Sequence, residues 1–294
     1  MINMFKKRKK GISVLLATQN TEKTVELSIK SFVDFADEII AVDNGSKDKT
    51  VEIVSNLEKE IPKLKFYNAP ELPDLYHNRQ YALEHSNYNW IARIDSDYIA
   101  YISGEFNIKY LRDIILNTKQ SIWPIAFEIT QVNLIYEFEH TGIPREVRPK
   151  GAGPHVPDPL VTLPARIVQY FPRMKFTRLG RWEGIRFQRF LKRLKLEKPY
   201  WFHCEIKSDM DYFYRSERTN WRELGDFKKY PTLGSYIRSI LKSKYGTDDI
   251  EEACELYMQK DFYPYLEKYD PERYYPYPKL IKDEMRRRKD KNEV

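Results

Sequence analysis

The chain has 294 residues, of which 41% are hydrophobic and 32% are charged. This length and composition are typical of a protein with a sizeable core, and they exclude a wholly disordered chain. No apolar run approaches the roughly 20 residues needed to span a bilayer, and no cleavage site follows the basic N-terminus, so the sequence predicts a cytoplasmic protein. Cys204 and Cys254 belong to no CxxC pair and are expected to be reduced and buried.

The net charge of +7 is concentrated in three stretches. Residues 1–10 carry five cations and no acid, residues 279–294 carry seven cations and four acids, and residues 166–198 carry eleven cations and two acids. This distribution favours contact with an anionic surface or acceptor over binding to a duplex. We therefore expect no nucleic-acid partner, and we expect the two tails to make peripheral contact with an anionic membrane at its cytoplasmic face. Ordinary solvated faces are an equally good explanation of these cations.

The first hundred residues alternate between strand-like and helix-like patterns. An unbroken apolar run predicts a buried strand at residues 11–17, and an apolar stripe predicts a helix at residues 21–35 that opens at Thr21. Further strands are predicted at residues 37–43, 64–68 and 89–95, and further helices at residues 51–57 and 75–85. This alternation predicts βαβ units and a mainly parallel, Rossmann-like sheet.

The remaining residues give fewer strand signals and more helical ones. Residues 142–164 hold six of the 17 prolines and predict a long loop or lid. Strands are predicted at residues 122–132, 165–171 and 199–206, and helices at residues 107–117, 208–224, 233–244, 248–258 and 278–290. The sequence therefore predicts an α/β domain followed by a helical C-terminal appendage.

Polar clusters follow three of the predicted strands, at residues 18–20, 43–46 and 95–97. In parallel sheets ligands bind beyond the carboxyl ends of the strands, so these clusters are expected to meet at one edge. Asp95 and Asp97 are spaced i, i+2, which suits a divalent cation that keeps positions open for phosphate oxygens. We expect Mn²⁺ or Mg²⁺ at this place, although an Asp-capped solvated turn would have the same tripeptide.

Two segments, SVLLATQNTEKTVELSIKSFVDFADEIIAVDNGSKDKTVEIV and NRQYALEHSNYNWIARIDSD, resemble family 2 glycosyltransferases of the GT-A fold. In that family a first strand ends in a T-x-N-type turn and a second ends in V-D-x-x-S-x-D-x-T. An Arg-Asn helix and a D-x-D follow. Order and spacing match over residues 11–99. The resemblance implies a Rossmann-like, mainly parallel sheet with flanking helices.

The resemblance also implies a donor site for a nucleoside-diphosphate sugar. The backbone around Ala17 and Thr18, with Asp43, would line the nucleoside pocket, while Arg79 would lie near the nucleotide. Asp95 would face the ribose and the metal, and Asp97 would ligate the metal. The implied donor-binding residues are Ala17, Thr18, Asp43, Asn44, Arg79, Asp95, Ser96, Asp97 and Lys207, and the implied metal ligands are Asp97, Asp95 and His203.

Two positions depart from the family pattern. Asn44 stands where many members have a second Asp that reads uracil, and Gln80 stands where an Asn is expected after Arg79. Asn44 can still hydrogen-bond a base edge, so a UDP-sugar stays the favoured donor on a weaker basis. An ordinary surface cation on a helix is the alternative for Arg79.

His203 lies in PYWFHCEIKSD, directly before a predicted helix, where a family histidine often completes the metal or pyrophosphate site. Lys207, four residues later, could reach the diphosphate leaving group. The alternative for His203 is a structural histidine in an aromatic strand. The other histidines are expected on the surface or in loops; they are His77, His85, His140 and His155.

Inverting transfer needs a general base for the acceptor hydroxyl. Relatives carry it in a G-x-x-H-E-like stretch, but here that region is LGRWEGIRFQRF, in which Glu183 is the only acid. The neighbouring Trp182 could desolvate Glu183 and raise its pKa. Alternatively, Glu183 pairs with a nearby arginine, and Asp158 in the proline-rich loop is the second candidate base.

The expected function is therefore an inverting, metal-dependent glycosyltransferase of hexosyltransferase type, acting in polysaccharide biosynthesis on a glycan or lipid-linked acceptor. Aromatic residues interleave with the cations of residues 166–198, which suits a phosphorylated or lipid-linked acceptor better than single-stranded nucleic acid. The expected domains are a basic tail at 1–10, a glycosyltransferase domain at 11–225, with a nucleotide-sugar half at 11–99 and an acceptor half at 100–225, and the appendage at 226–294.

Two other classes of function stay open. A sugar-nucleotide nucleotidyltransferase has the same alternation of strands and helices. Such an enzyme should carry a glycine-rich loop after the first strand, however, and ATQNTEKT has no glycine. The second is a nonenzymatic module that binds nucleic acid or an anionic membrane.

Overall fold

The computed structural model describes residues 8–119, 121–147, 156–179, 182–186 and 188–290; for residues 178, 179, 182, 183 and 188 it describes only the backbone. The chain forms two compact units. The first comprises Met1–Val132, Leu160–Cys204 and Pro271–Val294, and the second comprises Asn133–Pro159 and Glu205–Asp270. Since each unit draws on separate stretches of sequence, the domain boundaries expected at residues 10, 99 and 225 stay predictions.

The first unit contains a mixed sheet with the strand order β3-β2-β1-β4-β8-β6-β12-β5, and β11 pairs with β6. Strands β3, β2, β1 and β4 are parallel, whereas β8 is antiparallel to β4 and β6. The strands are β1 Lys9–Thr18, β2 Glu38–Asp43, β3 Leu64–Asn68, β4 Tyr88–Asp95, β5 Tyr98–Ala100, β6 Ile125–Ile135, β8 Leu160–Gln169, β11 Lys192–Leu196 and β12 Trp201–Glu205. The predicted parallel array of the first hundred residues is confirmed.

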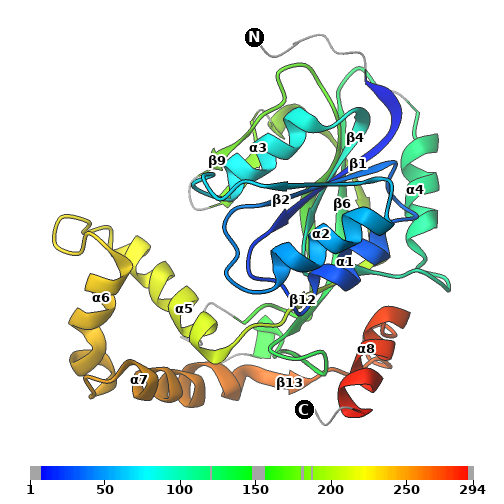
Figure 1. Cartoon of the computed structure of the whole chain (residues 1–294). Coiled ribbons are helices and arrows are strands. Elements are labelled where there is room, and N and C mark those ends of the chain that lie inside the picture. Colours follow the sequence, from blue (N-terminus) through cyan, green and yellow to red (C-terminus); the bar gives the residue numbers. More distant parts are fainter. Residues whose placement is uncertain (1–7, 120, 148–155, 180–181, 187, 291–294) are drawn as a thin grey trace. The chain divides into compact units, whose positions relative to one another are not determined.

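Both faces of this sheet are covered, which explains why its central strands are unbroken apolar runs. One face packs against α1 Val25–Phe32, α2 Thr50–Glu60 and α4 Ile108–Asn117. The other face packs against α3 Leu75–His85 and a hairpin of β9 Phe176–Leu179 and β10 Trp182–Ile185 (Figure 1). Helix α8, Lys279–Asp290, also belongs to this unit.

The predicted start of the first helix is wrong. Helix α1 begins at Val25, and Thr21 lies in the turn before it. The hydroxyl of Thr24 donates to the carbonyl oxygen of Ser96 at 3.1 Å instead of capping the helix. The N-terminus of α1 therefore helps to hold the backbone that follows β4.

The second unit is mainly helical and packs around its own aromatic core. A capping box on Ser208 starts α5, and Gly225, at a φ of 69°, ends it in the left-handed conformation that glycine favours. Its helices are α5 Asp209–Leu224, α6 Leu233–Ile240 and α7 Ile250–Tyr257, followed by π-helical turns at Leu241–Tyr245 and Met258–Phe262, and its strands β7 His140–Gly142 and β13 Leu266–Lys268 pair with each other. The predicted helices of the C-terminal part are confirmed.

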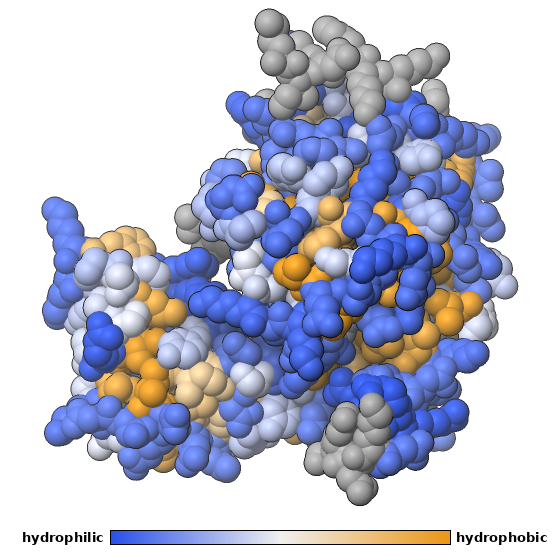
Figure 2. All heavy atoms as spheres, in the orientation of Figure 1, coloured by the Kyte–Doolittle hydropathy of each residue, from blue (hydrophilic) through white to orange (hydrophobic). Residues whose placement is uncertain are grey.

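The predicted α/β fold with flanking helices is thus confirmed, with two local corrections. Residues 160–164 belong to β8 and not to the predicted loop, in which Arg145–Val147 form a 3₁₀ turn and residues 148–155 lie outside the described part. The hairpin, β11, β5, β7 and β13 were not predicted. Hydrophilic residues cover most of the face seen in Figure 2. None of the helices in the described residues is long and apolar enough to cross a bilayer.

Candidate functional site

The register of the parallel strands brings the predicted polar clusters together. Thr18, the last residue of β1, pairs with Asp43, the last residue of β2. Ala17 pairs on the other side with Asp95, the last residue of β4. The three clusters therefore meet at the carboxyl edge of the sheet, where ligands bind in open parallel sheets.

Asp43 organises the turn after β2. Its side chain is fully buried; Oδ1 accepts from the backbone N–H groups of Gly45 at 2.9 Å and Ser46 at 2.8 Å. Its Oδ2 accepts from the hydroxyl of Thr18 at 2.9 Å and from that of Ser46. Gly45 adopts a φ of 99°, which a residue with a side chain rarely tolerates. Because its oxygens are occupied in this way, Asp43 shapes the pocket wall.

Asn44 follows this turn and is half-buried. The amide nitrogen of Asn78 donates to the carbonyl oxygen of Val42 at 2.8 Å and, more weakly, to Oδ1 of Asn44 at 3.4 Å. Asn78 is completely buried, and its own Oδ1 has no hydrogen-bond partner among the described residues. Asn78 was not singled out from the sequence, yet it holds the residue expected at the base edge.

Arg79 is not the surface cation that was kept as an alternative. Its side chain is 0% exposed. It donates to the carbonyl oxygens of Leu15 at 2.7 Å and Ile94, and it pairs with Oδ1 of Asp95. Helix α3 thus inserts a guanidinium beneath β1 and β4. Because these contacts hold the guanidinium in a fully buried place, a positioning role for Asp95 fits it better than direct contact with a ligand.

Asp95 lies between two arginines. Its Oδ1 meets Arg79, and its Oδ2 lies 3.2 Å from Nη1 of Arg166, while 29% of the side chain stays exposed. Burial raises the pKa of Asp95, but the charges of Arg79, Arg166 and Arg93 outweigh burial and hold that pKa well below its usual value. Asp95 is therefore a carboxylate at every physiological pH.

Arg166 is the main residue of the site that sequence reasoning missed. The register between β6 and β8 shifts between Phe127 and Ile129, and the extra residues of β8 include Ala165, at a φ of 50°. Such a bulge redirects a side chain from the face of the sheet that it would occupy in a regular strand. Arg166 reaches Asp95 and lies over the ring of Tyr98, with its guanidinium carbon 5.2 Å from the ring centroid. A lone cation inside the apolar run ARIV was the available signal.

Asp97 and His203 face each other at this edge. Nε2 of His203 lies 3.3 Å from Oδ2 of Asp97, and the two side chains are 20% and 17% exposed. The N–H of Cys204 donates to the carbonyl oxygen of Asp97 at 2.7 Å, which fixes the turn to β12. Oδ1 of Asp97 is buried without a hydrogen-bond partner in the described part of the chain.

A divalent cation would satisfy this orphaned oxygen, because buried carboxylate oxygens are almost always paired. Carboxylate and imidazole are ordinary ligands of Mn²⁺. No three His, Cys, Asp or Glu side chains of the described residues gather as a ready metal cluster, however. Asp97 and His203 thus fit a cation, whereas Asp95, the third expected ligand, is bonded to arginines.

The remaining predicted residues are spread over both units. The backbone of Glu183 pairs with Arg178 in the hairpin, but its side chain lies outside the described residues. Oδ1 of Asp158 accepts from the N–H of Arg145 at 2.8 Å. Lys207 is half-buried in the second unit, between β12 and α5.

Gln80, the second departure from the family pattern, binds the hairpin. Its Oε1 accepts from the N–H of Phe176 at 3.0 Å, so β9 is fastened to α3 next to Arg79. The hairpin that carries Glu183 is therefore anchored on the helix that holds Asp95.

The other described histidines are half-buried members of α3 and β7 and not the surface or loop residues expected, whereas the cysteines are buried as expected. His77 pairs with Asp74, His85 with the carbonyl oxygen of Tyr81, and His140 with Glu137, while His155 lies outside the described residues. Both cysteines are free and buried. Burial and, to a lesser extent, Asp97 raise the pKa of the Cys204 thiol, which makes it unreactive.

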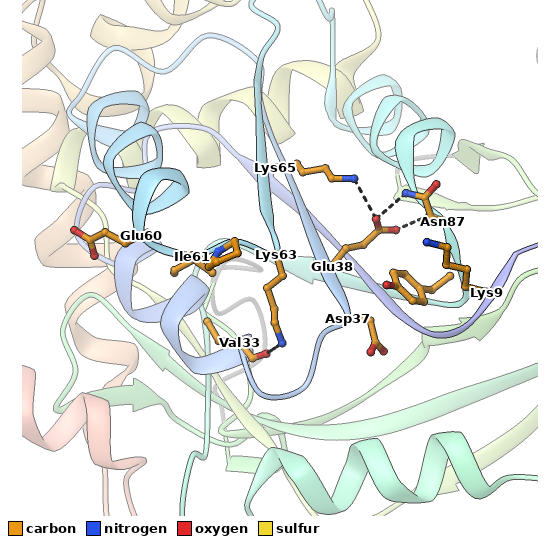
Figure 3. Close-up of a pocket in the computed structure, with 11 residues that line it drawn as sticks. Lys9, Val33, Asp37, Glu38, Glu60, Ile61, Lys63, Lys65 and Asn87 are labelled. Carbon is orange, nitrogen blue, oxygen red and sulfur yellow. Dashed lines mark hydrogen bonds and ion pairs between the residues drawn. The ribbon is translucent and has the colours of Figure 1, made fainter.

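A cavity of about 480 Å³ lies at the opposite, amino edge of the sheet (Figure 3). Glu38, Lys63 and Lys65, three of its charged residues, have structural partners. Oε2 of Glu38 lies 2.8 Å from Nδ2 of Asn87 and 3.6 Å from Nζ of Lys65, and Nζ of Lys63 donates to the carbonyl oxygen of Val33 at 2.9 Å. Because these groups satisfy one another, we do not assign a ligand to this cavity.

Replacing Arg79 by methionine is expected to lower the free energy of unfolding by about 3 kcal/mol, because the buried groups that the guanidinium contacts lose their partner. The carbonyl oxygens of Leu15 and Ile94 lose their donor, and Asp95 loses the ion pair at its Oδ1 while its Oδ2 stays beside Arg166. Urea unfolding measures the change. The matched control is Lys109→Met, an exposed cation paired with Asp34, which should cost less than about 1 kcal/mol. A similar cost for both variants would contradict the structural role of Arg79.

Comparison with known proteins agrees with the resemblance noted in the sequence. Residues 13–103 match the family model described as Glycosyl transferase family 2. The match covers the strands and turns that form the carboxyl edge of the sheet. It supports a nucleotide-sugar glycosyltransferase. No curated relative matches the chain.

Several solved structures are similar at low identity. TarS 1–349 of S. aureus is 18% identical over 86% of this chain and 80% of that chain, with a TM-score of 0.37. TarS 1–349 in complex with UDP-GlcNAc is 16% identical over 86% and 78%, with a TM-score of 0.40. Glucosyl-3-phosphoglycerate synthase from Mycobacterium tuberculosis, in complex with Mn²⁺, uridine diphosphate and glucosyl-3-phosphoglycerate, is 25% identical over 40% and 43%, with a TM-score of 0.31. TM-scores this low transfer no site geometry.

Proposed function

We propose that this chain, whose residues 13–103 match glycosyl transferase family 2, is a metal-dependent inverting glycosyltransferase. It moves a sugar from a nucleoside-diphosphate donor, with a UDP-sugar favoured, to a glycan or lipid-linked acceptor. One observation carries the proposal most: Asp97 presents a buried, unpartnered carboxylate oxygen beside His203, at the edge where parallel sheets bind nucleotides.

Asp97 and His203 would hold Mn²⁺ or Mg²⁺ in this proposal. The cation, when bound, neutralises the charge that develops on the departing diphosphate. The residues around it fix the ligands in advance. Thr24 holds the carbonyl oxygen of Ser96, and Cys204 holds that of Asp97. A preorganised site of this kind loses little energy to rearrangement when charge develops.

Asp95 would serve the donor through its exposed face. Its Oδ1 is held by the buried Arg79, so the carboxylate is fixed in the ionised state. Direct contact of Oδ2 with a ribose or a cation requires Arg166 to move from its present position. Arg166 would in that case be a further cation for the diphosphate, in addition to the expected Lys207.

The nucleoside pocket would be formed by Ala17, Thr18 and Asn44, with Asp43 as the internal brace of the wall. The hydrogen bond from Asn78 to Asn44 supports a fixed amide at the base edge. Glu183, the candidate base, is carried by the hairpin that Gln80 anchors on α3. Asp158 is the second candidate for the same role.

The experiment that tests this function is the release of nucleoside diphosphate from a panel of nucleotide sugars, with and without Mn²⁺ or Mg²⁺. At least one donor, with UDP-sugars expected to lead, should be turned over only when the metal is present. A nonenzymatic binding module would release no nucleoside diphosphate from any of them.

A further inference from the structure

Three large apolar side chains are exposed together at one place on the first unit. Ile122 is 97% exposed, Trp123 is 56% exposed and Phe190 is 47% exposed. The rings of Trp123 and Phe190 stack, with centroids 6.0 Å apart and an interplanar angle of 16°. We call these three residues the Trp123 patch. Single exposed apolar residues are ordinary, whereas contiguous ones usually mark an interaction surface.

Cations surround the Trp123 patch. The guanidinium carbon of Arg189 lies 5.2 Å from the ring centroid of Phe190. The N–H of Lys192 donates to the carbonyl oxygen of Pro124 at 2.8 Å. Since Pro124 follows Trp123 directly, the start of β11 lies close to the patch. Residues 186–195 carry five cations and no acid, although Arg193 pairs with Glu128 and Lys195 with Glu197. The net charge beside the apolar patch is therefore positive.

The Trp123 patch lies at the amino edge of the sheet, away from the donor site. Ile125 at the start of β6 pairs with Lys192, and Ala126 pairs with Val168 of β8. The next residue of β8, Gln169, pairs with Trp90 near the start of β4. Asp95 comes five residues after Trp90, which corresponds to about 16 Å along the strand. The reacting sugar at the opposite edge therefore cannot be the partner of the patch.

The basic N-terminal segment enters the fold at this same edge. Lys9, the first residue of β1, pairs with Tyr88, the first residue of β4. Arg8 donates to the hydroxyl of Ser86 at 2.8 Å and lies over the ring of Tyr170, with its guanidinium carbon 3.7 Å from the centroid. Arg8, Lys9 and Lys10 thus lie at the edge that carries the Trp123 patch.

We propose that the Trp123 patch is the face on which this chain docks onto an anionic lipid bilayer. Tryptophan and phenylalanine favour the interfacial zone, and surrounding cations attract anionic headgroups. The exposed Ile122 favours a bilayer over a nucleic acid or a sugar, because a branched aliphatic side chain stacks on neither a base nor a sugar ring. The Ile122 side chain is removed from water when it enters the boundary between headgroups and acyl chains, which stabilises the bound state. The inference does not depend on the proposed transferase activity, and its test uses no sugar substrate.

Flotation of the full chain with vesicles tests the inference. The chain should float with vesicles of phosphatidylcholine and phosphatidylglycerol, and much less of it should float with vesicles of phosphatidylcholine alone. Binding to the anionic vesicles should fall as the salt concentration is raised. The double variant Ile122→Ser, Trp123→Ser should bind at least about tenfold more weakly, since it loses the inserted apolar surface. The matched control is Phe227→Ser, which removes an aromatic that is 51% exposed in the second unit and should bind as wild type does.

Tryptophan fluorescence supplies an independent readout. Vesicles should shift the emission of the wild type to the blue, and Trp123→Phe should keep binding while losing most of that shift, because Trp90 and Trp201 are already buried and Trp221 donates its indole N–H to the carbonyl oxygen of Tyr230. Trp182→Phe, measured in parallel, should keep the shift. Unchanged vesicle binding of the double variant would overturn the proposal. The proposal would also be overturned if the double variant lost binding to single-stranded DNA as strongly as binding to vesicles, since the patch would then bind nucleic acid. A concentration-dependent dimer that Trp123→Ser abolishes would instead assign the patch to a second copy of the chain.

Discussion

Replacing Asp97 by alanine is expected to abolish metal-dependent binding of the nucleotide sugar. The variant removes the carboxylate whose Oδ1 is buried without a partner and whose Oδ2 faces His203. Even a residue that only orients a metal ligand is worth about 10- to 100-fold in metal affinity, so loss of the ligand itself should cost at least about 100-fold. Titration calorimetry with UDP-glucose or UDP-GlcNAc and Mn²⁺ measures the change.

The fold should survive this replacement, because Asp97 lies at the sheet edge and its carbonyl oxygen, not its side chain, holds Cys204. Removal of an uncompensated buried carboxylate can even raise the unfolding free energy. The matched control is Asp113→Ala, which removes an exposed carboxylate on α4 and should leave binding unchanged. Donor affinity in Asp97→Ala equal to that of the control would remove Asp97 from the site.

The second large effect concerns the general base. Glu183→Gln is expected to lower kcat by about 10²- to 10⁴-fold and to leave the KM for the donor near that of the wild type, since a base acts in the transition state. The amide keeps the shape of the side chain, so lost basicity is separated from lost packing. The rate is measured as release of nucleoside diphosphate from the donor.

A structural Glu183, paired with an arginine on an exposed face, predicts a different outcome. The rate of Glu183→Gln would then stay within a few-fold of wild type, and the free energy of unfolding would change by less than about 1 kcal/mol. Asp158→Asn is the comparison variant; its Oδ1 already accepts from the N–H of Arg145, so a moderate loss of stability is expected there. A large rate loss confined to Asp158→Asn would move the role of base to that residue.

Much of the first unit could be predicted because its strands are sequence-local apolar runs. The third strand and the third helix were predicted with the bounds that the structure has, Leu64–Asn68 and Leu75–His85. Buried parallel strands and amphipathic helices carry period signals that do not depend on distant residues. The convergence of Thr18, Asp43 and Asp95 then followed from the rule that parallel strands end at one edge.

The parts that could not be predicted depend on long-range pairing. Strand β11, KRLKL, is rich in exposed cations and becomes a strand only by pairing with β6. The bulge that directs Arg166 to Asp95 is a property of the β6–β8 register. The burial of Arg79 could not be read from α3 either, because its partners come from β1 and β4.

These long-range contacts change how the site is understood. From sequence, both Asp95 and Asp97 were expected at the metal, with Asp95 also facing the ribose. In the structure Asp95 is bound by Arg79 and Arg166, whereas Asp97 keeps one oxygen without a partner in the described residues. We therefore expect Asp97 to matter chiefly for the cation and Asp95 chiefly for the donor.

The central claim is that this chain cleaves a nucleotide sugar with the help of a cation at Asp97. Its most direct measurement is the release of nucleoside diphosphate by the wild type in Mn²⁺ and in EDTA, with Asp97→Ala measured in parallel. We expect release from a UDP-sugar in Mn²⁺, and background release both in EDTA and with the variant. Release that is unchanged in EDTA, or equal in Asp97→Ala and the wild type, would contradict it.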